Sequence, residues 1–399
     1  MCPLEQRREF ILEWRSNRIS KSALCDLFGI SRQTGYKWAR RFARSSKWTS
    51  LDEQSRRPHS SPMSTPMRLV KRILSMRRQR PTWGPVPIRA VLRKAYPREP
   101  WPSVSTFGAI LKRYGLVSPR RRRYRAAPRS RPFSACRNPN DVWCVDFKGQ
   151  FPTGDGRMCY PLTVMDGASR FLLACVGFHT PSLENVRAVF VELFRQYGLP
   201  KAIRSDNGEP FASVSKAAGL TELSAWWARL GIRLERIDPG KPQQNGRLER
   251  MHLTLKIETC SPPRRSLGWQ QRAFDRFRQR YNHERPHQAL GLATPATLYV
   301  PSTIPFPTEL PQLHYPFGDV HLVKRDGSIR WRRRRFFISQ SLAGQTVAVN
   351  TIDNRHQQVV FAGIVLGLID VETPEYGLLR PKFNRRKNRS TQLSAISPV

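Results

Sequence analysis

An apolar run that contains one carboxylate is the feature that most constrains the fold of this 399-residue chain. Residues 142–147 read VWCVDF, a pattern typical of a buried strand. Burying an ionised carboxylate is costly unless a cation or hydrogen bonds compensate for its charge. Asp146 therefore marks a candidate site as well as a strand.

The residues after this run alternate between strand and helix patterns. Strand patterns occur at 159–166, 170–178, 201–205 and 232–237, and helical patterns occur at 182–198, 221–230 and 243–259. Three strands followed by alternating helices and strands predict a mixed α/β sheet within residues 139–300.

Two further acidic residues stand where they could converge with Asp146. Asp206 ends a predicted strand and precedes Asn207-Gly208, and Glu249 falls on a predicted helix. Two Mg²⁺ ions about 3.5–4 Å apart require bridging carboxylates and hard oxygen ligands. Taken singly, Asp206 reads as a turn residue and Glu249 as a surface residue, and only the set of three predicts a metal site.

The N-terminal 48 residues predict a helix-turn-helix. Ser20 precedes one helical pattern, Gly29 ends it, and Ser31 begins the next helix. An ordinary helical hairpin would produce the same pattern.

The second of these helices carries the side chains that we expect to enter the major groove of DNA: Arg32, Gln33 and Lys37. The aromatic residues of this helix are expected to pack inside, at least in part: Tyr36, Trp38 and Phe42.

A second helical unit, also resembling a helix-turn-helix, is predicted at 67–118, after a linker at 49–66 that is rich in Ser and Pro. Ser103 or Ser105 would cap its last helix. A basic stretch at 119–138 follows, and it reads either as a solvated linker or as an arm that contacts DNA through Arg121, Arg122 and Arg123.

The C-terminal part is separated from the sheet by a Pro-rich linker at 301–318. Short strand patterns, with a hairpin turn at Asp326-Gly327, predict a small β-barrel over 319–375. This unit would either bind DNA through the basic run 332–335 or mediate assembly. Residues 376–399 are expected to be a basic, disordered tail.

The charge of the chain favours nucleic acid as its partner. It has 69 Lys and Arg against 29 Asp and Glu, a net charge of +40, and residues 1–135 supply +25 of this. Clustered cations displace counterions from phosphates, although a ribosomal protein would have a similar balance. No membrane span or signal peptide is expected, and the seven scattered Cys are typical of reduced thiols in a cytoplasmic protein.

Several motifs together resemble the DDE core of the transposases related to retroviral integrases, closest to bacterial insertion-sequence transposases of the IS481 and IS3 type. The matching segments are WCVDF (143–147), SDNG (205–208), PGKPQQNGRLER (239–250) and YNHERPHQALG (281–291), with PTWGP (81–85) ahead of the core. The resemblance covers residues 1–300 strongly and the C-terminal unit more loosely.

The resemblance implies an RNase H-like fold for 139–300 that uses two Mg²⁺ ions per active site, with Mn²⁺ as a substitute. Asp146 would bridge both ions, Asp206 would complete one metal site and Glu249 the other. The interval between Asp206 and Glu249 is longer than is usual for integrases. The extra residues are expected in 212–223, as a loop and the start of a helix.

The same resemblance implies further contacts with DNA. Gln244 and Asn245 would lie at the mouth of the site. Lys256, seven residues after Glu249, would contact the transposon end, and His252 is a weaker candidate for the same surface.

The implied function is that of an insertion-sequence transposase. It would bind terminal inverted repeats as a homo-oligomer in the bacterial cytoplasm, associated with the nucleoid, free a 3′-hydroxyl at each end, and transfer it into target DNA. Two alternatives stay open: a catalytically silent, domesticated transposase that acts as a sequence-specific repressor, and a cellular nuclease of RNase H-like fold.

Overall fold

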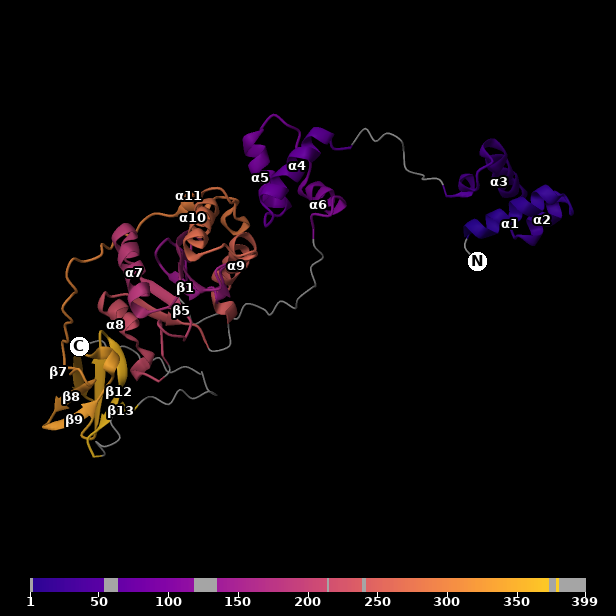
Figure 1. The fold of residues 1–399 in the computed structure, drawn as a ribbon. Helices are drawn as coiled ribbons and strands as arrows, with labels where there is room; N and C mark the ends of the chain where they lie inside the picture. The colour runs from indigo at the N-terminus through magenta and orange to yellow at the C-terminus, as the bar shows by residue number, and fades with distance from the viewer. Residues whose placement is uncertain are drawn as a thin grey trace, which may run out of the picture. The chain divides into compact units, whose positions relative to one another are not determined.

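The computed structural model describes residues 3–53, 64–117, 135–213, 215–238, 242–372 and 378–379, and divides the chain into two compact units, Met1–Thr65 and Pro66–Val399 (Figure 1). Arg121, Arg122 and Arg123 and nearly all of the predicted tail lie outside the described residues. Among the described residues, no helix has the length and apolar character needed to cross a membrane.

The N-terminal unit is a small helical domain with the predicted turn. It contains α1 (Pro3–Ser16), α2 (Lys21–Leu27), α3 (Arg32–Ser45) and the short helix η1 (Trp48–Leu51). Ser20 and Ser31 accept hydrogen bonds from backbone N–H groups in the first turns of α2 and α3, which confirms both as helix caps. Gly35 of α3 lies so close to Cys25 and Phe10 that a Cβ atom would clash with both, so only glycine allows this packing.

The second unit begins with three helices, α4 (Met67–Gln79), α5 (Pro85–Ala95) and α6 (Val104–Arg113). Ser103, one of the two predicted caps, accepts a hydrogen bond from Thr106 N at the start of α6. Buried apolar residues join the helices: Val70, Ile73, Leu74, Trp83, Ile88, Leu92, Phe107, Ile110 and Leu111.

A mixed sheet follows, as the alternation of patterns predicted. Its strands are β1 (Trp143–Phe147), β2 (Phe151–Pro152), β3 (Met158–Asp166), β4 (Leu172–Phe178), β5 (Ala202–Ser205) and β6 (Arg233–Arg236). The order is β2-β3-β1-β5-β6, with β4 also paired to β3. β1 runs antiparallel to β3 and parallel to β5, and β5 is parallel to β6. The two-residue strand β2 was not predicted.

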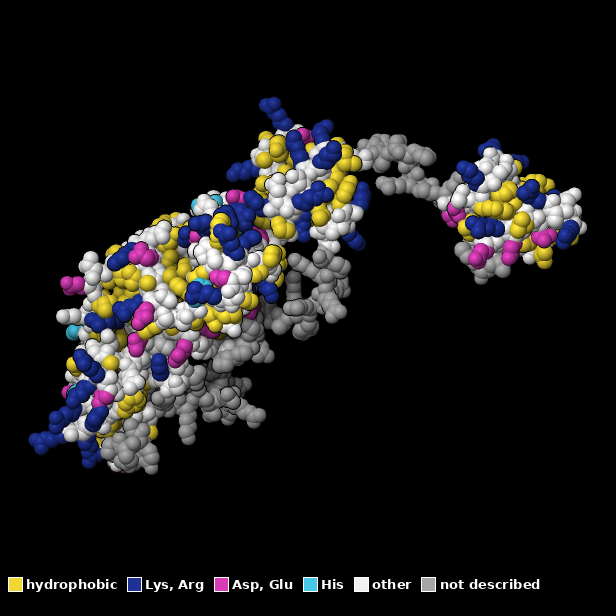
Figure 2. All heavy atoms as spheres, viewed as in Figure 1, with side chains coloured by type: hydrophobic (Ala, Val, Ile, Leu, Met, Phe, Trp, Pro, Cys, Tyr) yellow, Lys and Arg dark blue, Asp and Glu magenta, His cyan; other side chains and the backbone are white. Residues whose placement is uncertain are grey.

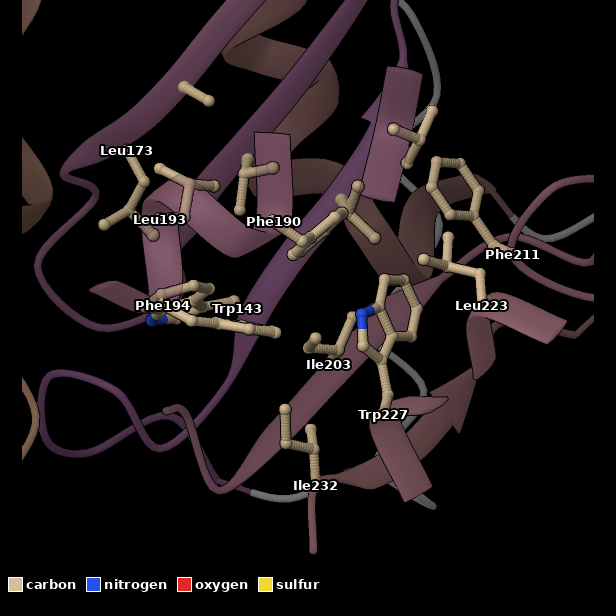
Figure 3. Close-up of a cluster of buried hydrophobic side chains, with 14 of the residues drawn as sticks. Trp143, Leu173, Phe190, Leu193, Phe194, Ile203, Phe211, Leu223, Trp227 and Ile232 are labelled. Carbon is tan, nitrogen blue, oxygen red and sulfur yellow. The ribbon is translucent and has the colours of Figure 1, made fainter. Parts of the chain in front are cut away.

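Helices cover both faces of this sheet. Their bounds are α7 (Leu183–Tyr197), α8 (Glu222–Arg229), α9 (Gly246–Leu255), the π-helical turn η4 (Lys256–Cys260), α10 (Leu267–His283) and α11 (Pro295–Leu298). On one face, Phe190 and Phe194 of α7 and Trp227 of α8 pack with Trp143 and Ile203 of the strands (Figure 3). On the other face, α9 and α10 pack through residues such as Leu248 and Phe274.

The predicted insertion between the second and third acidic residues is confirmed as a loop and the start of a helix. The described residues of 212–223 form the short helix η2 (Ala217–Gly219) and lead into α8, without a strand.

The C-terminal strands are present, but the described residues do not close into the predicted barrel. One sheet has the order β13-β12-β11-β10-β7, and β8 pairs only with β9 in a separate hairpin. The bounds are β7 (Asp319–Leu322), β8 (Ser328–Trp331), β9 (Arg334–Phe337), β10 (Thr346–Thr351), β11 (His356–Phe361), β12 (Ile364–Asp370) and β13 (Leu378–Leu379). Closure is not needed to bury the apolar face, because Leu220 and Ala225 of the preceding domain and Trp331 of the hairpin pack against it.

Candidate active site

Strand alternation decides which face of the sheet each acidic residue occupies. Trp143 and Val145 of β1 belong to the core under α7 and α8, whereas Val142 and Cys144 belong to the core under α9 and α10. Because successive side chains point to opposite faces, Asp146 lies on the same face as Cys144, beneath the helix that carries Glu249.

Asp206 reaches this same face from the neighbouring strand. Ala202 of β5 packs in the core under α9 and α10, and Asp206 follows it by four residues, so both fall on one face as far as the strand pattern extends. Gly208 N donates a 3.2 Å hydrogen bond to Asp206 Oδ1, and a Cβ at Gly208 would crowd that carboxylate. Asn207 Nδ2 donates to the carbonyl oxygen of Ile237 at 2.5 Å, which ties the loop to the end of β6.

Glu249 lies in the first turn of α9, with an exposed side chain. Leu248, Met251 and Leu255 of the same helix are buried against the sheet. The amphipathic pattern of α9 therefore fixes which way Glu249 faces.

The pKa of Asp146 shows that the three carboxylates act on one another. Burial raises this pKa to about 7, and the negative charge of Asp206 adds to the rise; Glu249 contributes less. The backbone N–H of Phe147 and the charge of Lys148 oppose it. An elevated pKa in a carboxylate beside two others is a physical marker of a functional site.

The carboxylates are gathered but not closed around one point. In the parts of the chain that the structure describes, no three or more His, Cys, Asp or Glu side chains lie close enough to hold a metal ion. The donor chemistry nevertheless fits Mg²⁺, because carboxylate oxygens are its preferred protein ligands. No described Lys or Arg pairs with Asp146, Asp206 or Glu249, so a cation would relieve a repulsion that the protein leaves in place.

His252, predicted as a weak candidate for the DNA-facing surface, is instead buried beside the site. Its side chain is buried between α9 and the sheet, where Nε2 lies 2.7 Å from Thr163 Oγ1. Its Nδ1 atom lies 4.0 Å from Asp146 Oδ2. Burial lowers its pKa to about 3, so the ring is neutral. The prediction failed because it placed His252 by its distance from Glu249 in sequence alone.

The amides predicted at the mouth of the site are engaged or buried. Gln244 accepts a 2.7 Å hydrogen bond from Asp238 N and donates one of 3.0 Å to Asp238 Oδ2. Asn245 is 5% exposed, and its Oδ1 atom has no hydrogen-bond partner among the described residues. Their contact with DNA stays a prediction.

Lys256 is exposed and begins the turn η4. Glu258, two residues later, faces away from the site. Its side chain is 11% exposed and pairs with Arg280 at 3.5 Å and Arg285 at 3.7 Å. These ion pairs distinguish Glu258 from Glu249, which has no cationic partner among the described residues.

The predicted DNA-facing side chains of the N-terminal unit share one exposed face of α3. Arg32, Gln33 and Lys37 line a shallow hollow there, together with further basic residues that the sequence analysis did not single out: Arg40, Arg41 and Arg44. Lys and Arg side chains are also frequent on the visible surface of this unit (Figure 2).

Tyr36 packs inside only in part: its ring centroid lies 4.9 Å from that of Trp14, but the side chain is 46% exposed and also lines the same hollow, which was not predicted. Its spacing was the missed signal: Tyr36 lies four residues from Arg32 and four from Arg40, so all three share a helix face. Phe42 is buried and Trp38 is half-buried, as expected.

Comparison with known families gives a domain assignment that follows these structural parts. Models described as integrase core domain match residues 137–242 and 230–295, and a helix-turn-helix domain model matches residues 6–59. The chain is therefore similar to integrase core domains over residues 137–295 and to a helix-turn-helix domain over residues 6–59.

Two similar proteins come from bacterial insertion elements. The uncharacterized 31.7 kDa protein of IS407 from Burkholderia multivorans is 31% identical over 40% of this chain and 54% of its own length. The uncharacterized 39.2 kDa protein of IS476 from Xanthomonas euvesicatoria is 29% identical over 45% of this chain and 50% of its own length. The chain thus spans about half the length of these curated relatives.

Solved structures resemble this chain with low identity and low TM-scores. The HTLV-2 integrase catalytic core domain in complex with magnesium covers 41% of this chain and 98% of its own, with a TM-score of 0.32 at 16% identity. A chain of the simian T-cell lymphotropic virus intasome in complex with a PP2A regulatory subunit covers 73% of this chain and 97% of its own, with a TM-score of 0.36 at 15% identity.

Proposed function

We propose that this protein is an insertion-sequence transposase that cleaves the 3′ ends of its element and joins them to target DNA. The observation that carries the proposal is the placement of Asp146 and Asp206 on the sheet face under the helix of Glu249, with no described Lys or Arg paired to them. Burial and the neighbouring charges of Asp206 and Glu249 raise the pKa of Asp146, which agrees with this placement. A family match alone would allow an inactive descendant, whereas three unneutralised carboxylates on one face are the equipment of a working site.

Each residue has a distinct task in this proposal. Asp146 would help to hold both Mg²⁺ or Mn²⁺ ions, and Asp206 and Glu249 would each help to hold one of them. When bound, such ions supply an activated oxygen nucleophile and neutralise the leaving oxygen. Gly208 and Asn207 hold the Asp206 loop in place.

The bonds change in two steps, with no covalent intermediate on the protein. In the first step a water oxygen attacks the phosphorus at the element end, and the bond to the 3′ oxygen breaks to leave a 3′-hydroxyl. In the second step that hydroxyl attacks a target phosphodiester in line and releases a target 3′-hydroxyl. Each step forms one phosphorus–oxygen bond and breaks one.

Recognition of the element ends is assigned to the N-terminal unit. The basic face of α3 combines hydrogen-bonding side chains with the exposed ring of Tyr36, and a helix of this kind fits the major groove. Lys256, which is exposed at the start of η4, is a further proposed contact. Because two ends must be joined together, we place at least two copies of the chain on the DNA, in the bacterial cytoplasm.

The test is strand transfer with the full chain, Mg²⁺ and a labelled duplex carrying the inverted repeat that flanks the coding region. We expect the wild type to join the repeat to target DNA and Asp146→Asn to bind the repeat without joining it. Sequence-specific binding without cleavage in Mg²⁺ or Mn²⁺ would instead identify a repressor. Cleavage of any duplex without joining would identify a cellular nuclease.

A further inference from the structure

A buried histidine lies between the strand of Asp146 and the helix of Glu249. His252 is on α9, three residues after Glu249, and only 8% of it is exposed. Its Nε2 atom lies 2.7 Å from Thr163 Oγ1, and its Nδ1 atom lies 4.0 Å from Asp146 Oδ2. The ring therefore faces both a fully buried hydroxyl and the central carboxylate.

Thr163 connects this ring to the backbone of Asp146. It is the cross-strand partner of Asp146 in the β1–β3 pairing, and its Oγ1 donates a 3.0 Å hydrogen bond to the carbonyl oxygen of Asp146. A threonine hydroxyl has a single proton, and here that proton is used on Asp146. Thr163 Oγ1 must consequently accept from His252, so Nε2 carries the ring proton.

This assignment leaves Nδ1 without a proton, facing the carboxylate. At 4.0 Å it does not form a hydrogen bond with Asp146 Oδ2. The neutral ring adds no positive charge that would compete with a cation for Asp146. A lysine or arginine in the same place would neutralise the carboxylate and weaken a metal site.

We propose that His252 is a positioning residue that, through Thr163, fixes the backbone of Asp146 relative to the helix that carries Glu249. The two carboxylates lie on different elements, β1 and α9, and no described hydrogen bond joins them directly. Among the described residues, the His252–Thr163–Asp146 chain of hydrogen bonds provides a polar link between those elements. This inference rests on the proposed metal-dependent function, because its consequence is the geometry that the ions meet.

A purely structural role for His252 makes a different prediction. If the ring only fills the core, its loss would lower the stability and leave metal affinity unchanged. Thr254 provides the matched control, because it lies on the same helix, is 8% exposed, and bonds only to the carbonyl oxygen of Arg250. Thr254→Val should therefore change stability without touching the site.

The experiment measures Mn²⁺ affinity by calorimetry on the full chain, alongside the Mg²⁺ concentration for half-maximal strand transfer and the thermal midpoint. We expect His252→Ala and Thr163→Val to weaken Mn²⁺ binding about tenfold or more, the usual effect of losing a group that orients a metal ligand. Thr163→Ser keeps the hydroxyl and should restore affinity to within about twofold. Thr254→Val should bind Mn²⁺ like the wild type.

Two outcomes would overturn the inference in distinguishable ways. If Asp146→Asn abolishes Mn²⁺ binding but His252→Ala and Thr163→Val leave it unchanged, His252 does not position the site and the proposed function survives. If Asp146→Asn also leaves Mn²⁺ binding unchanged, the metal site itself is wrong, and both proposals fall. Should His252→Ala not fold, the pair Thr163→Val and Thr163→Ser decides alone.

Discussion

The two ends of one helical stretch treat their glutamates in opposite ways. At its start, Glu249 of α9 is exposed and has no described cationic partner, and it adds to the repulsion on Asp146. At its end, Glu258 of η4 is almost buried and is surrounded by Arg280, Arg285 and the hydroxyl of Thr82. The two glutamates are nine residues apart, yet Glu249 has no described cationic partner, whereas Glu258 has two arginines and a hydroxyl as partners.

The difference is instructive because cations are abundant in this protein. With 69 Lys and Arg in the chain, pairing a surface glutamate is easy, and leaving three carboxylates unpaired on one face requires the fold to keep cations away. Glu258 ties η4 to Arg280 of α10 and to Thr82 in the loop before α5, whereas Glu249 has no ion-pair partner among the described residues. The two glutamates are the same residue type, so their positions on the helical stretch determine which of them is paired with arginines.

The largest effect is expected when each glutamate is neutralised in turn, which tests whether the two have different roles. We expect Glu249→Gln to lower strand transfer by about 10³-fold or more, beyond the 10- to 100-fold effect of losing a group that only supports a ligand. Glu258→Gln should keep activity within a few-fold but lower the free energy of unfolding by about 1–3 kcal/mol, because Arg280 and Arg285 lose their buried partner. Strand-transfer assays and chemical denaturation of both variants provide the measurement.

Equal loss of activity in the two variants would contradict the assignment of the two glutamates. If Glu258→Gln loses activity only in proportion to its unfolded fraction, the assignment stands, because chemical denaturation measures that fraction. Activity at a lower temperature, where both variants are folded, is the control.

A second test uses the pH dependence of stability in metal-free protein. The pKa of Asp146 is about 7 when folded, above its ordinary value, so the folded state binds more protons and stability falls as pH rises from about 4 to 7. The pKa of His252 is about 3 when folded, below its ordinary value, so stability rises as pH rises from about 3 to 6.5. The two groups therefore oppose each other over nearly the same range.

Substituting either residue should reveal the pH dependence of stability that the other residue causes. Relative to the wild type, Asp146→Asn should gain stability as pH rises from 4 to 7, and His252→Ala should lose it between 3 and 6.5. The full difference corresponds to about 4 kcal/mol for Asp146 and about 5 kcal/mol for His252. We expect about half of it for Asp146, because water reaches 29% of its side chain. Urea unfolding at several pH values measures both slopes, and slopes of the same sign would refute the pKa assignments.

Much of this fold could be predicted from the sequence because local pattern determines it. The strands around Asp146 and Asp206 and the helix of Glu249 lie where apolar periodicity placed them, and Ser31 caps α3 as its position predicted. The same alternation that identifies a strand also fixes which face a residue occupies. Local pattern was therefore sufficient to place Asp146 and Asp206 on one face of the sheet, and the position of α9 over that face is a tertiary feature.

Other features depend on partners that are distant in sequence, and local pattern does not contain them. Barrel closure in the C-terminal unit requires its edge strands to pair, and the apolar face is instead covered by Leu220 and its neighbours, about a hundred residues earlier. The contact of His252 with Thr163 spans 89 residues and needs the sheet register to be known. The exposure of Tyr36, in contrast, was available from helix spacing and was missed.

The smallest expected effect concerns the third partner of Glu258. Thr82 Oγ1 donates a hydrogen bond to Glu258 Oε1 and accepts one of 3.0 Å from Arg285 Nη1, so it joins Glu258 to one of its arginines. Thr82→Val should lower the free energy of unfolding by about 1 kcal/mol, the usual value of a partly buried hydrogen bond, and leave strand transfer unchanged. Combined with Glu258→Gln, it should cost less than the sum of the two, because both remove the same bond.

Thr297→Val, which alters an exposed hydroxyl bonded only to the nearby Thr294, is the control. Strict additivity in chemical denaturation would mean that Thr82 does not share in the compensation of Glu258, and the contrast between the two glutamates would then rest on the arginines alone.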